Sequence, residues 1–294
     1  MFAQSTKYLF RVTVMVCFLL LDSFQVQSQT REAVWSAPTK DSISGHGVYQ
    51  VASYTDFVES LSFRQGTIYY PVDTPGRIGG VAVSPGYTET QRHVDWWGPR
   101  LASHGYAVLV LDTNEPGDVP EVRAEALIEA VRILRREHQR KASPLFKRMN
   151  VREMAVMGHS MGGGGALIAA NKYGDEIQAA IPFTSWQPDG VFDRVTVPTL
   201  VIAGENDQIA PVEDHAWPHF LSIPSTTPKV YMEFDESDHF IADSERGMDL
   251  ETVGRYGIAW LKIYLDNDER YASFIYGDEQ QLDQVKFSRY VTNP

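Results

Sequence analysis

The sequence predicts an α/β fold, in which a mainly parallel central sheet is flanked by helices on both faces. Between residues 60 and 266, short apolar runs alternate with longer helical patterns, which is typical of such a sheet. No repeat, low-complexity tract or polar linker interrupts this stretch. Hydrophobic residues make up 43% of the chain and charged residues 22%, which excludes a disordered chain and a membrane bundle.

Seven apolar runs are typical of buried strands. They are residues 66–70, 80–84, 107–111, 154–157, 179–182, 199–203 and 229–234. We further expect one or two edge strands within residues 31–60. No element is assigned to residues 267–294.

Helical periodicity is clearest over residues 121–138. The face expected to be buried comprises Val122, Ala126, Ala130, Ile133 and Leu134. Further helices are predicted over residues 163–173 and 249–265.

The chain begins with a segment typical of a secretory signal peptide. Lys7 and Arg11 supply positive charge, residues 12–21 are apolar, and residues 26–28 form a small-x-small cleavage site. A membrane anchor would need about 20 apolar residues, more than this run provides. We therefore predict a signal peptide over residues 1–28, a single domain over residues 29–294, and a secreted protein without a membrane anchor.

Charge and cysteine content exclude several classes of protein. The net charge of −12 argues against nucleic-acid binding, which depends on clustered Lys and Arg, and favours a soluble monomer. The single cysteine, Cys17, excludes an intramolecular disulfide and thiolate zinc sites. We expect neither a metal nor a cofactor.

Residues 158–162 read Gly-His-Ser-Met-Gly, a match to the G-x-S-x-G nucleophile elbow. A predicted strand precedes the motif and a predicted helix follows it, as an elbow requires. Gly158 and Gly162 would let neighbouring backbone pass close to a strained turn that presents Ser160. The alternative, a phosphate-binding turn, would need further basic residues or a G-x-G-x-x-G start, and neither is present.

A serine hydroxyl needs a base, which in this fold follows the nucleophile in sequence after an acid. The histidines after Ser160 are His215, His219 and His239. His239 follows the strand 229–234 at the expected carboxyl edge of the sheet, so we predict it to be the base. The four-residue spacing of His215 and His219 could suggest a metal pair, but no suitably placed carboxylate completes a site, so we interpret both as packing or surface residues.

Asp207 is the favoured acid, because it follows the strand 199–203 at the same edge of the sheet. Asp193 is the alternative. Like Asp189, it lies in the loop after the preceding predicted strand, 179–182. Asp235 and Asp238 lie too near the histidine in sequence to reach its Nδ1 comfortably.

The oxyanion hole needs two backbone donors. One is expected to be the N–H of Met161, the residue after the nucleophile. The second should come from the loop 85–87, where proline has no N–H and Tyr87 is the natural donor.

At these residues the sequence resembles the bacterial cutinases and poly(ethylene terephthalate) hydrolases, a lidless branch of the α/β-hydrolases. The matching blocks are SPGYT (84–88), WWGPRLASHGYAVLVLDTN (96–114), VMGHSMGGGG (156–165), VTVPTLVIAGENDQIAPV (195–212) and DHF (238–240). The resemblance implies a triad of Ser160, Asp207 and His239. It also implies a substrate cleft lined by Tyr87, Met161, Trp186 and Ile209.

Several positions depart from the family pattern. His159 and Phe240 look like ordinary cutinases rather than the best-known mesophilic poly(ethylene terephthalate) hydrolase, which has tryptophan and serine there. Both flank the triad, so we expect their side chains to border the cleft. Asp243 stands where relatives carry asparagine, and the family's C-terminal disulfide is impossible here. Some relatives bind calcium on the surface; Asp235 is a candidate ligand for such a site in this chain, but no complete set of ligands is identified.

The sequence therefore predicts an ester hydrolase that cleaves polyesters such as cutin through an acyl-enzyme. Only 79 residues separate Ser160 from His239, which leaves no room for a cap domain and favours an open cleft. The alternatives are a lipase or esterase restricted to short acylglycerols and small esters, and a non-catalytic binding protein, which would need a broken triad.

Overall fold

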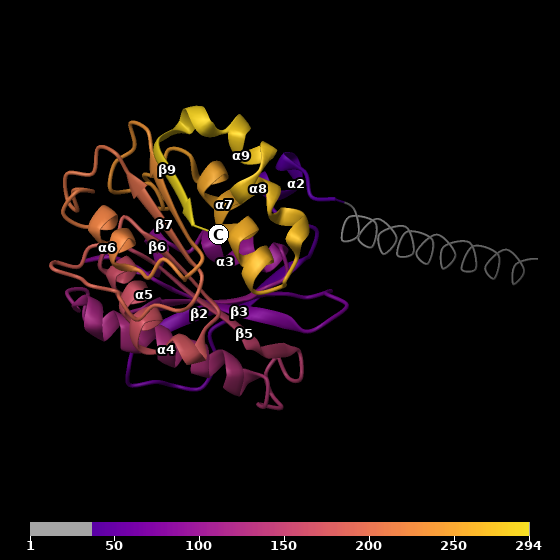
Figure 1. Ribbon diagram of the computed structural model, residues 1–294. Helices are drawn as coiled ribbons and strands as arrows, with labels where there is room; N and C mark the ends of the chain where they lie inside the picture. Colours follow the sequence, from indigo (N-terminus) through magenta and orange to yellow (C-terminus); the bar gives the residue numbers. More distant parts are fainter. Residues whose placement is uncertain (1–36, 294) are drawn as a thin grey trace, which may run out of the picture. The chain divides into compact units, whose positions relative to one another are not determined.

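The computed structural model describes residues 37–293, and within them nine strands form one mixed sheet (Figure 1). The strands are β1 (Val51–Tyr54), β2 (Gln65–Pro71), β3 (Ile78–Ser84), β4 (Ala107–Asp112), β5 (Met149–His159), β6 (Ala179–Phe183), β7 (Thr199–Gly204), β8 (Lys229–Phe234) and β9 (Phe287–Asn293). Their order is β1-β2-β4-β3-β5-β6-β7-β8-β9. Strands β3 to β8 are parallel, whereas β1, β2 and β9 pair antiparallel at the two edges.

Helices cover both faces of the sheet, with α4 and α5 on one side and α3 and α7 on the other (Figure 1). The helices are α2 (Lys40–Ser44), α3 (Trp97–Ser103), α4 (Pro120–Glu137), α5 (Met161–Lys172), α6 (Ala216–Ser222), α7 (Leu250–Tyr264), α8 (Ser273–Tyr276) and α9 (Asp278–Leu282). Short 3-10 helices are η1 (Gln91–His93), η2 (Gly174–Glu176), η3 (Glu269–Tyr271) and η4 (Gln284–Lys286).

The central strands supply side chains to two hydrophobic cores, one on each face of the sheet. Val81 and Val83 of β3 pack with α3 and α7, whereas Ala82 between them packs with α4 and α5. Because both faces of the sheet are covered, the side chains that point to either face are buried. The strands therefore appear in the sequence as continuous apolar runs. This confirms the predicted α/β class, and all seven predicted strands are present.

The two ends of the described chain differ most from expectation. Within residues 37–60 there is one edge strand, β1, preceded by the short helix α2. Residues 267–293, to which no element was assigned, contain α8, α9 and the edge strand β9. The burial of β9 does not alternate cleanly along FSRYVTN, which explains why its sequence gives no strand pattern.

One position on the predicted buried face of α4 is wrong. Val122 is 38% exposed, whereas the neighbouring Arg123 is fully buried. The other four predicted positions of that face are buried. The helix thus turns a charged side chain inward, and the reason lies in the loop contacts described below.

Ion pairs of Asp283 hold the C-terminal segment against the rest of the fold. The buried side chain of Arg255 on α7 donates to Asp283. Lys40 on α2 donates to the other oxygen of the same carboxylate, at 2.6 Å. Asp283 therefore connects the segment to two helices that are distant in sequence.

The described residues from Pro38 onward form one compact unit. The predicted signal peptide, residues 1–28, lies outside the described residues. Among residues 37–293, no helix combines the length and the apolar character needed to cross a membrane.

Candidate active site

Ser160 lies at the turn between β5 and α5 in a strained conformation, with φ 55° and ψ −117°. Such a backbone costs on the order of 1–3 kcal/mol for a residue with a side chain. The flanking glycines are required sterically. A Cβ on Gly158 would lie 2.2 Å from the carbonyl oxygen of Gly162, and one on Gly162 would lie 2.4 Å from that of Ser84. The close backbone approach expected from the motif is therefore present.

The strained turn is fixed by hydrogen bonds to the next strand. The N–H of Ser160 donates to the carbonyl of Phe183 at 3.0 Å, and its own carbonyl accepts from the N–H of Trp186 at 2.9 Å. The ring of Trp186 stacks on His215, with the centroids 5.9 Å apart. The serine and the loop after β6 are thus held as one unit.

The structure brings His239 and Asp207 together. Nδ1 of His239 lies 2.7 Å from Oδ2 of Asp207, and both residues are only 3% exposed. The second carboxylate oxygen accepts from the N–H groups of Ile209 and Ala210, at 2.9 and 2.7 Å. Asp193, the alternative acid, lies exposed in the loop between β6 and β7.

His215 and His219 are buried packing residues. His219 lies 3.0 Å from the hydroxyl of Ser185 and 2.8 Å from the carbonyl of Gln187, and His215 accepts from the N–H of Gln187. Burial lowers the pKa of His219 to about 4, so this ring is neutral at pH 7. Within residues 37–293, no group of three or more His, Cys, Asp and Glu side chains is placed to hold a metal ion.

The loop expected to supply the second oxyanion donor is fixed on both sides of Tyr87. The N–H of Gly86 donates to Oε2 of Glu89 at 2.6 Å, and the N–H of Thr88 donates to the carbonyl of Pro116 at 2.8 Å. The N–H of the other expected donor belongs to the first residue of α5, where a helix provides no intrahelical acceptor.

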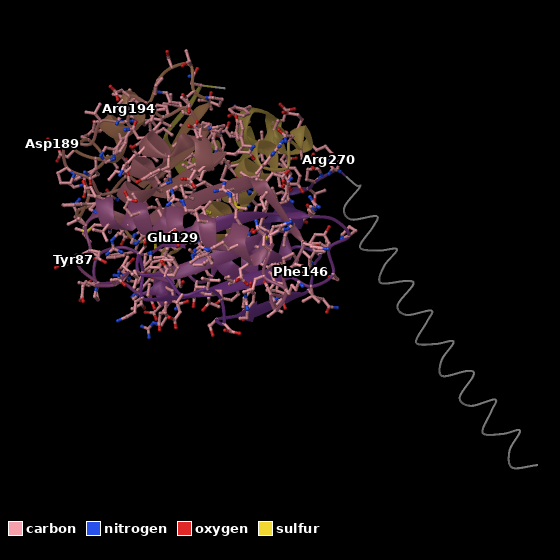
Figure 2. All side chains as sticks on the ribbon, turned by 90° about the horizontal axis from the view of Figure 1, so that it is seen from below. Tyr87, Glu129, Phe146, Asp189, Arg194 and Arg270 are labelled. Carbon is pink, nitrogen blue, oxygen red and sulfur yellow. The ribbon has the colours of Figure 1, made fainter. Side chains whose placement is uncertain are left out.

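These residues meet in a cleft of about 510 Å³. The predicted site residues that line it are Tyr87, Ser160, Ile209, His239 and Phe240. Sequence reasoning missed Thr88, Glu89, His93, Glu245 and Arg246. Figure 2 shows Tyr87 and Asp189, which both follow carboxyl ends of strands, on one side of the molecule, and Phe146, which precedes β5, on the other.

Met161 and Trp186 were expected to line the cleft. Both are half-buried next to Ser160 and do not belong to the lining of this cleft.

The predicted position of His159 at the border of the cleft is wrong, because its side chain is fully buried. Its Nδ1 lies 2.8 Å from Oε2 of Glu89, and its Nε2 lies 2.8 Å from the carbonyl oxygen of His239. Alternation along β5 turns this ring away from the nucleophile and into the protein.

Arg123 supports the loop from below and was also missed. Its guanidinium donates to the carbonyls of Pro85, Pro116 and Asp118, at 2.9, 2.9 and 2.8 Å. Three carbonyl partners explain why a charged side chain is buried on α4. No local pattern identifies such a residue; the only signal is a charged residue inside an otherwise apolar helix face.

A serine on a strained strand-to-helix turn at the carboxyl edge of a parallel sheet, with a His–Asp pair in the same cleft, defines the serine-nucleophile class of α/β-hydrolases. Comparisons with known proteins specify this class further. The sequence profile of the PETase family, described as PET hydrolase-like, matches residues 27–293. The chain therefore belongs to the PET hydrolase-like family.

Named relatives agree with this assignment. The chain is 41% identical over 244 residues to a bis(hydroxyethyl) terephthalate hydrolase of Streptomyces coelicolor, a match that covers 81% of this chain and 75% of the relative. It is 44% identical over 218 residues to cutinase 1 of Thermobifida cellulosilytica, covering 74% of this chain and 80% of the relative. A cutinase of Thermobifida fusca is also 44% identical over 218 residues, with 74% and 69% covered.

Proposed function

We propose that the chain is a secreted serine ester hydrolase that cleaves polyesters, such as cutin and poly(ethylene terephthalate), through an acyl-enzyme on Ser160. As a member of the family it is a carboxylic ester hydrolase. The observation that carries the proposal is the buried Asp207–His239 pair, whose histidine lines the same cleft as a serine held on a strained turn.

In the proposed mechanism, His239 takes the proton of the Ser160 hydroxyl as Oγ attacks the ester carbonyl. Because Asp207 accepts the Nδ1 hydrogen, Nε2 is left free to act as the base. The N–H groups of Tyr87 and Met161 stabilise the oxyanion. The alcohol leaves with the proton from His239, and water then hydrolyses the acyl-enzyme with the same histidine as base. This chemistry needs no cofactor.

The form of the cleft supports a bulky ester as the substrate. Tyr87 and Ile209 are 56% and 52% exposed, and Phe240 adds a third apolar side chain. No helix intervenes between β6 and β7, so no inserted cap covers the cleft there. Flat apolar side chains on an open cleft suit aromatic or aliphatic acyl groups of a polymer.

The proposal is tested on four substrates. Turnover of a para-nitrophenyl ester by the wild type, and its loss by about 10⁴-fold or more in Ser160→Ala, separates an enzyme from a binding protein. Product release from cutin and from poly(ethylene terephthalate) film, compared with tributyrin, separates a polyesterase from an esterase of small acylglycerols. Activity of Ser160→Ala above a hundredth of the wild type would contradict the assignment of the nucleophile.

We also propose that the enzyme is secreted as a monomer after cleavage of residues 1–28, with residues 29–294 as one catalytic domain. Mass spectrometry of the exported protein would locate its N-terminus, and light scattering would give its mass in solution.

A further inference from the structure

The buried ring of His159 has an acceptor at each nitrogen. The carbonyl oxygen of His239, 2.8 Å from Nε2, can only accept a hydrogen bond. The carboxylate of Glu89, 2.8 Å from Nδ1, also acts as an acceptor when ionised. A neutral imidazole carries one N–H and can donate to only one of these groups, whereas an imidazolium donates to both.

The surroundings of Glu89 keep it ionised. Its Oε2 also accepts from the N–H of Gly86 at 2.6 Å, and its Oε1 lies 3.4 Å from Nη2 of Arg246. Burial raises the pKa of this carboxyl, but hydrogen bonds and the charge of His159 outweigh burial and bring the pKa below its usual value. For His159, burial lowers the pKa, because it disfavours the charged ring. The hydrogen bond to Glu89 and the negative charge of Glu89 outweigh burial and raise the pKa of His159 above its usual value.

We propose that His159 is a buried imidazolium which, paired with Glu89, positions the oxyanion loop against the loop of the catalytic histidine. The proposal rests on the proposed ester hydrolase function of Ser160. His159 and Glu89 are positioning residues, since the proposed role acts through the backbone of Tyr87 and His239 rather than on the substrate.

Packing explains how this pair could fix the geometry of catalysis. A Cβ on Gly86 would lie 2.8 Å from Oε2 of Glu89 and 2.9 Å from Cβ of Ser160. The carboxylate and the nucleophile are therefore both packed closely against this glycine. The next residue is Tyr87, the proposed oxyanion donor. At the other end of the pair, the carbonyl of His239 accepts from His159 and from the hydroxyl of Thr184, at 2.9 Å. Deprotonation of His159 would leave either Glu89 or the carbonyl of His239 facing the lone pair of an unprotonated ring nitrogen.

Other titratable and charged groups face the pair from neighbouring elements. They are His93 of η1, Arg123 of α4, and His239, Asp243 and Arg246 of the segment after β8. Arg246 also forms an ion pair with Asp243, at 2.9 Å, and its side chain is 45% exposed. Of the two basic side chains in contact with Glu89, His159 is the fully buried one and the nearer one, at 2.8 Å against 3.4 Å for Arg246.

The protonation state is tested without any activity measurement, by ¹⁵N NMR of histidine side chains in the wild type at pH 7.5. We expect both ring nitrogens of His159 to be protonated. His104 and His219 serve as internal standards, because burial lowers the pKa of each to about 4 and one nitrogen of each ring should be unprotonated. An unprotonated nitrogen in His159 would overturn the proposal.

The positioning role is tested with Glu89→Gln, which keeps the shape of the side chain and removes its charge. We expect the second N–H of His159 to be lost, and kcat on a soluble para-nitrophenyl ester to fall about tenfold or more with KM within about twofold, as for a small displacement of catalytic groups. The wild type should lose kcat at alkaline pH as His159 deprotonates, and Glu89→Gln should lack this decline. Glu129→Gln, on α4 and distant from the cleft residues in sequence and fold, is the matched control and should retain the wild-type profile.

A Glu89→Gln enzyme with wild-type kcat and with the imidazolium lost would overturn the positioning role. If Glu89→Gln does not fold, the wild-type NMR and the alkaline decline still decide the proposal. A wild type that folds and does not hydrolyse esters would instead refute the proposed function, while the NMR result would still establish the charge of His159.

Discussion

The guanidinium of Arg246 lies on the ring of Phe240, with its Cζ 3.3 Å from the ring centroid. The edge of the ring also meets His239, with the two centroids 5.5 Å apart. Nη2 of Arg246 donates to Asp243 at 2.9 Å, which holds the guanidinium in place. A cation on an aromatic face contributes about 0.5–2 kcal/mol, so Phe240 is a fixed part of the cleft wall.

We expect Phe240→Ser to change the turnover of bulky polyesters more than that of a small acetate ester. Removal of the ring widens the cleft, removes the cation–π contact with Arg246 and removes apolar contact with long acyl groups. Such contact is worth about 1–3 kcal/mol when fully buried and less in an open cleft. Product release from polyester film and kinetics on para-nitrophenyl acetate measure the two effects.

Met248→Ser is the matched control for this substitution, because Met248 lies in the same segment, is 81% exposed and does not line the cleft. It should leave both rates unchanged. An equal proportional change of both rates in Phe240→Ser would mean that Phe240 acts by supporting His239, and the interpretation as a substrate contact would be abandoned.

The choice of acid gives a second prediction. Asp207→Asn should reduce kcat about 10⁴-fold, since the amide can no longer hold the imidazole in the tautomer that leaves Nε2 free. Asp193→Asn should retain wild-type kcat, because its side chain is exposed in another loop. Both variants are compared on a soluble ester, and the reverse order of activities would show that His239 is oriented by a different carboxylate in solution.

The parts of this site that the sequence predicts are those with local causes. The turn at Ser160 depends on glycines two residues away on either side, and the carboxyl edge of the sheet follows from alternating strands and helices. The order of nucleophile, acid and base along the chain then limits the partners to a few residues after each strand.

What the sequence does not predict depends on contacts between distant segments. The burial of His159 becomes possible because Glu89 and the carbonyl of His239 meet it from loops 70 and 80 residues away. Arg123 is buried because the carbonyl of Pro85, 38 residues away in sequence, meets it together with two carbonyls of the loop that precedes α4. Strand β9 exists because β8 offers an unpaired edge, which its own sequence does not reveal.

The third prediction concerns the support of the oxyanion loop by Arg123. Arg123→Met removes three hydrogen bonds to carbonyls and should lower kcat about 10- to 100-fold, somewhat less than the loss of an oxyanion donor itself. Arg132→Met, on the same helix, removes a surface ion pair with Glu176 and should leave kcat unchanged. Loss of stability in Arg123→Met with unchanged kcat would mean that the loop keeps its position without the arginine.

The fourth prediction is a pH-dependent loss of stability in Asp283→Asn. Burial raises the pKa of Asp283, but hydrogen bonds from Lys40 and Arg255 outweigh burial and bring it below its usual value. A carboxyl with a lowered pKa in the folded state stabilises the protein above its unfolded pKa of about 3.9 and loses this contribution as the pH falls through the folded value. At pH 7, Asp283→Asn removes the buried carboxylate that pairs with Arg255 and should lower the free energy of unfolding by about 3–5 kcal/mol.

Urea denaturation of both proteins from pH 7 to pH 3 measures this difference. Because protonation neutralises the wild-type carboxyl in the same way as the amide, the gap between the two proteins should narrow below about pH 4. Asp175→Asn is the control: its side chain is exposed, so its unfolding free energy should stay within about 0.5 kcal/mol of the wild type. A gap that is constant down to pH 3 would mean that the shape of the side chain at position 283, rather than its charge, holds the C-terminal segment to α2 and α7.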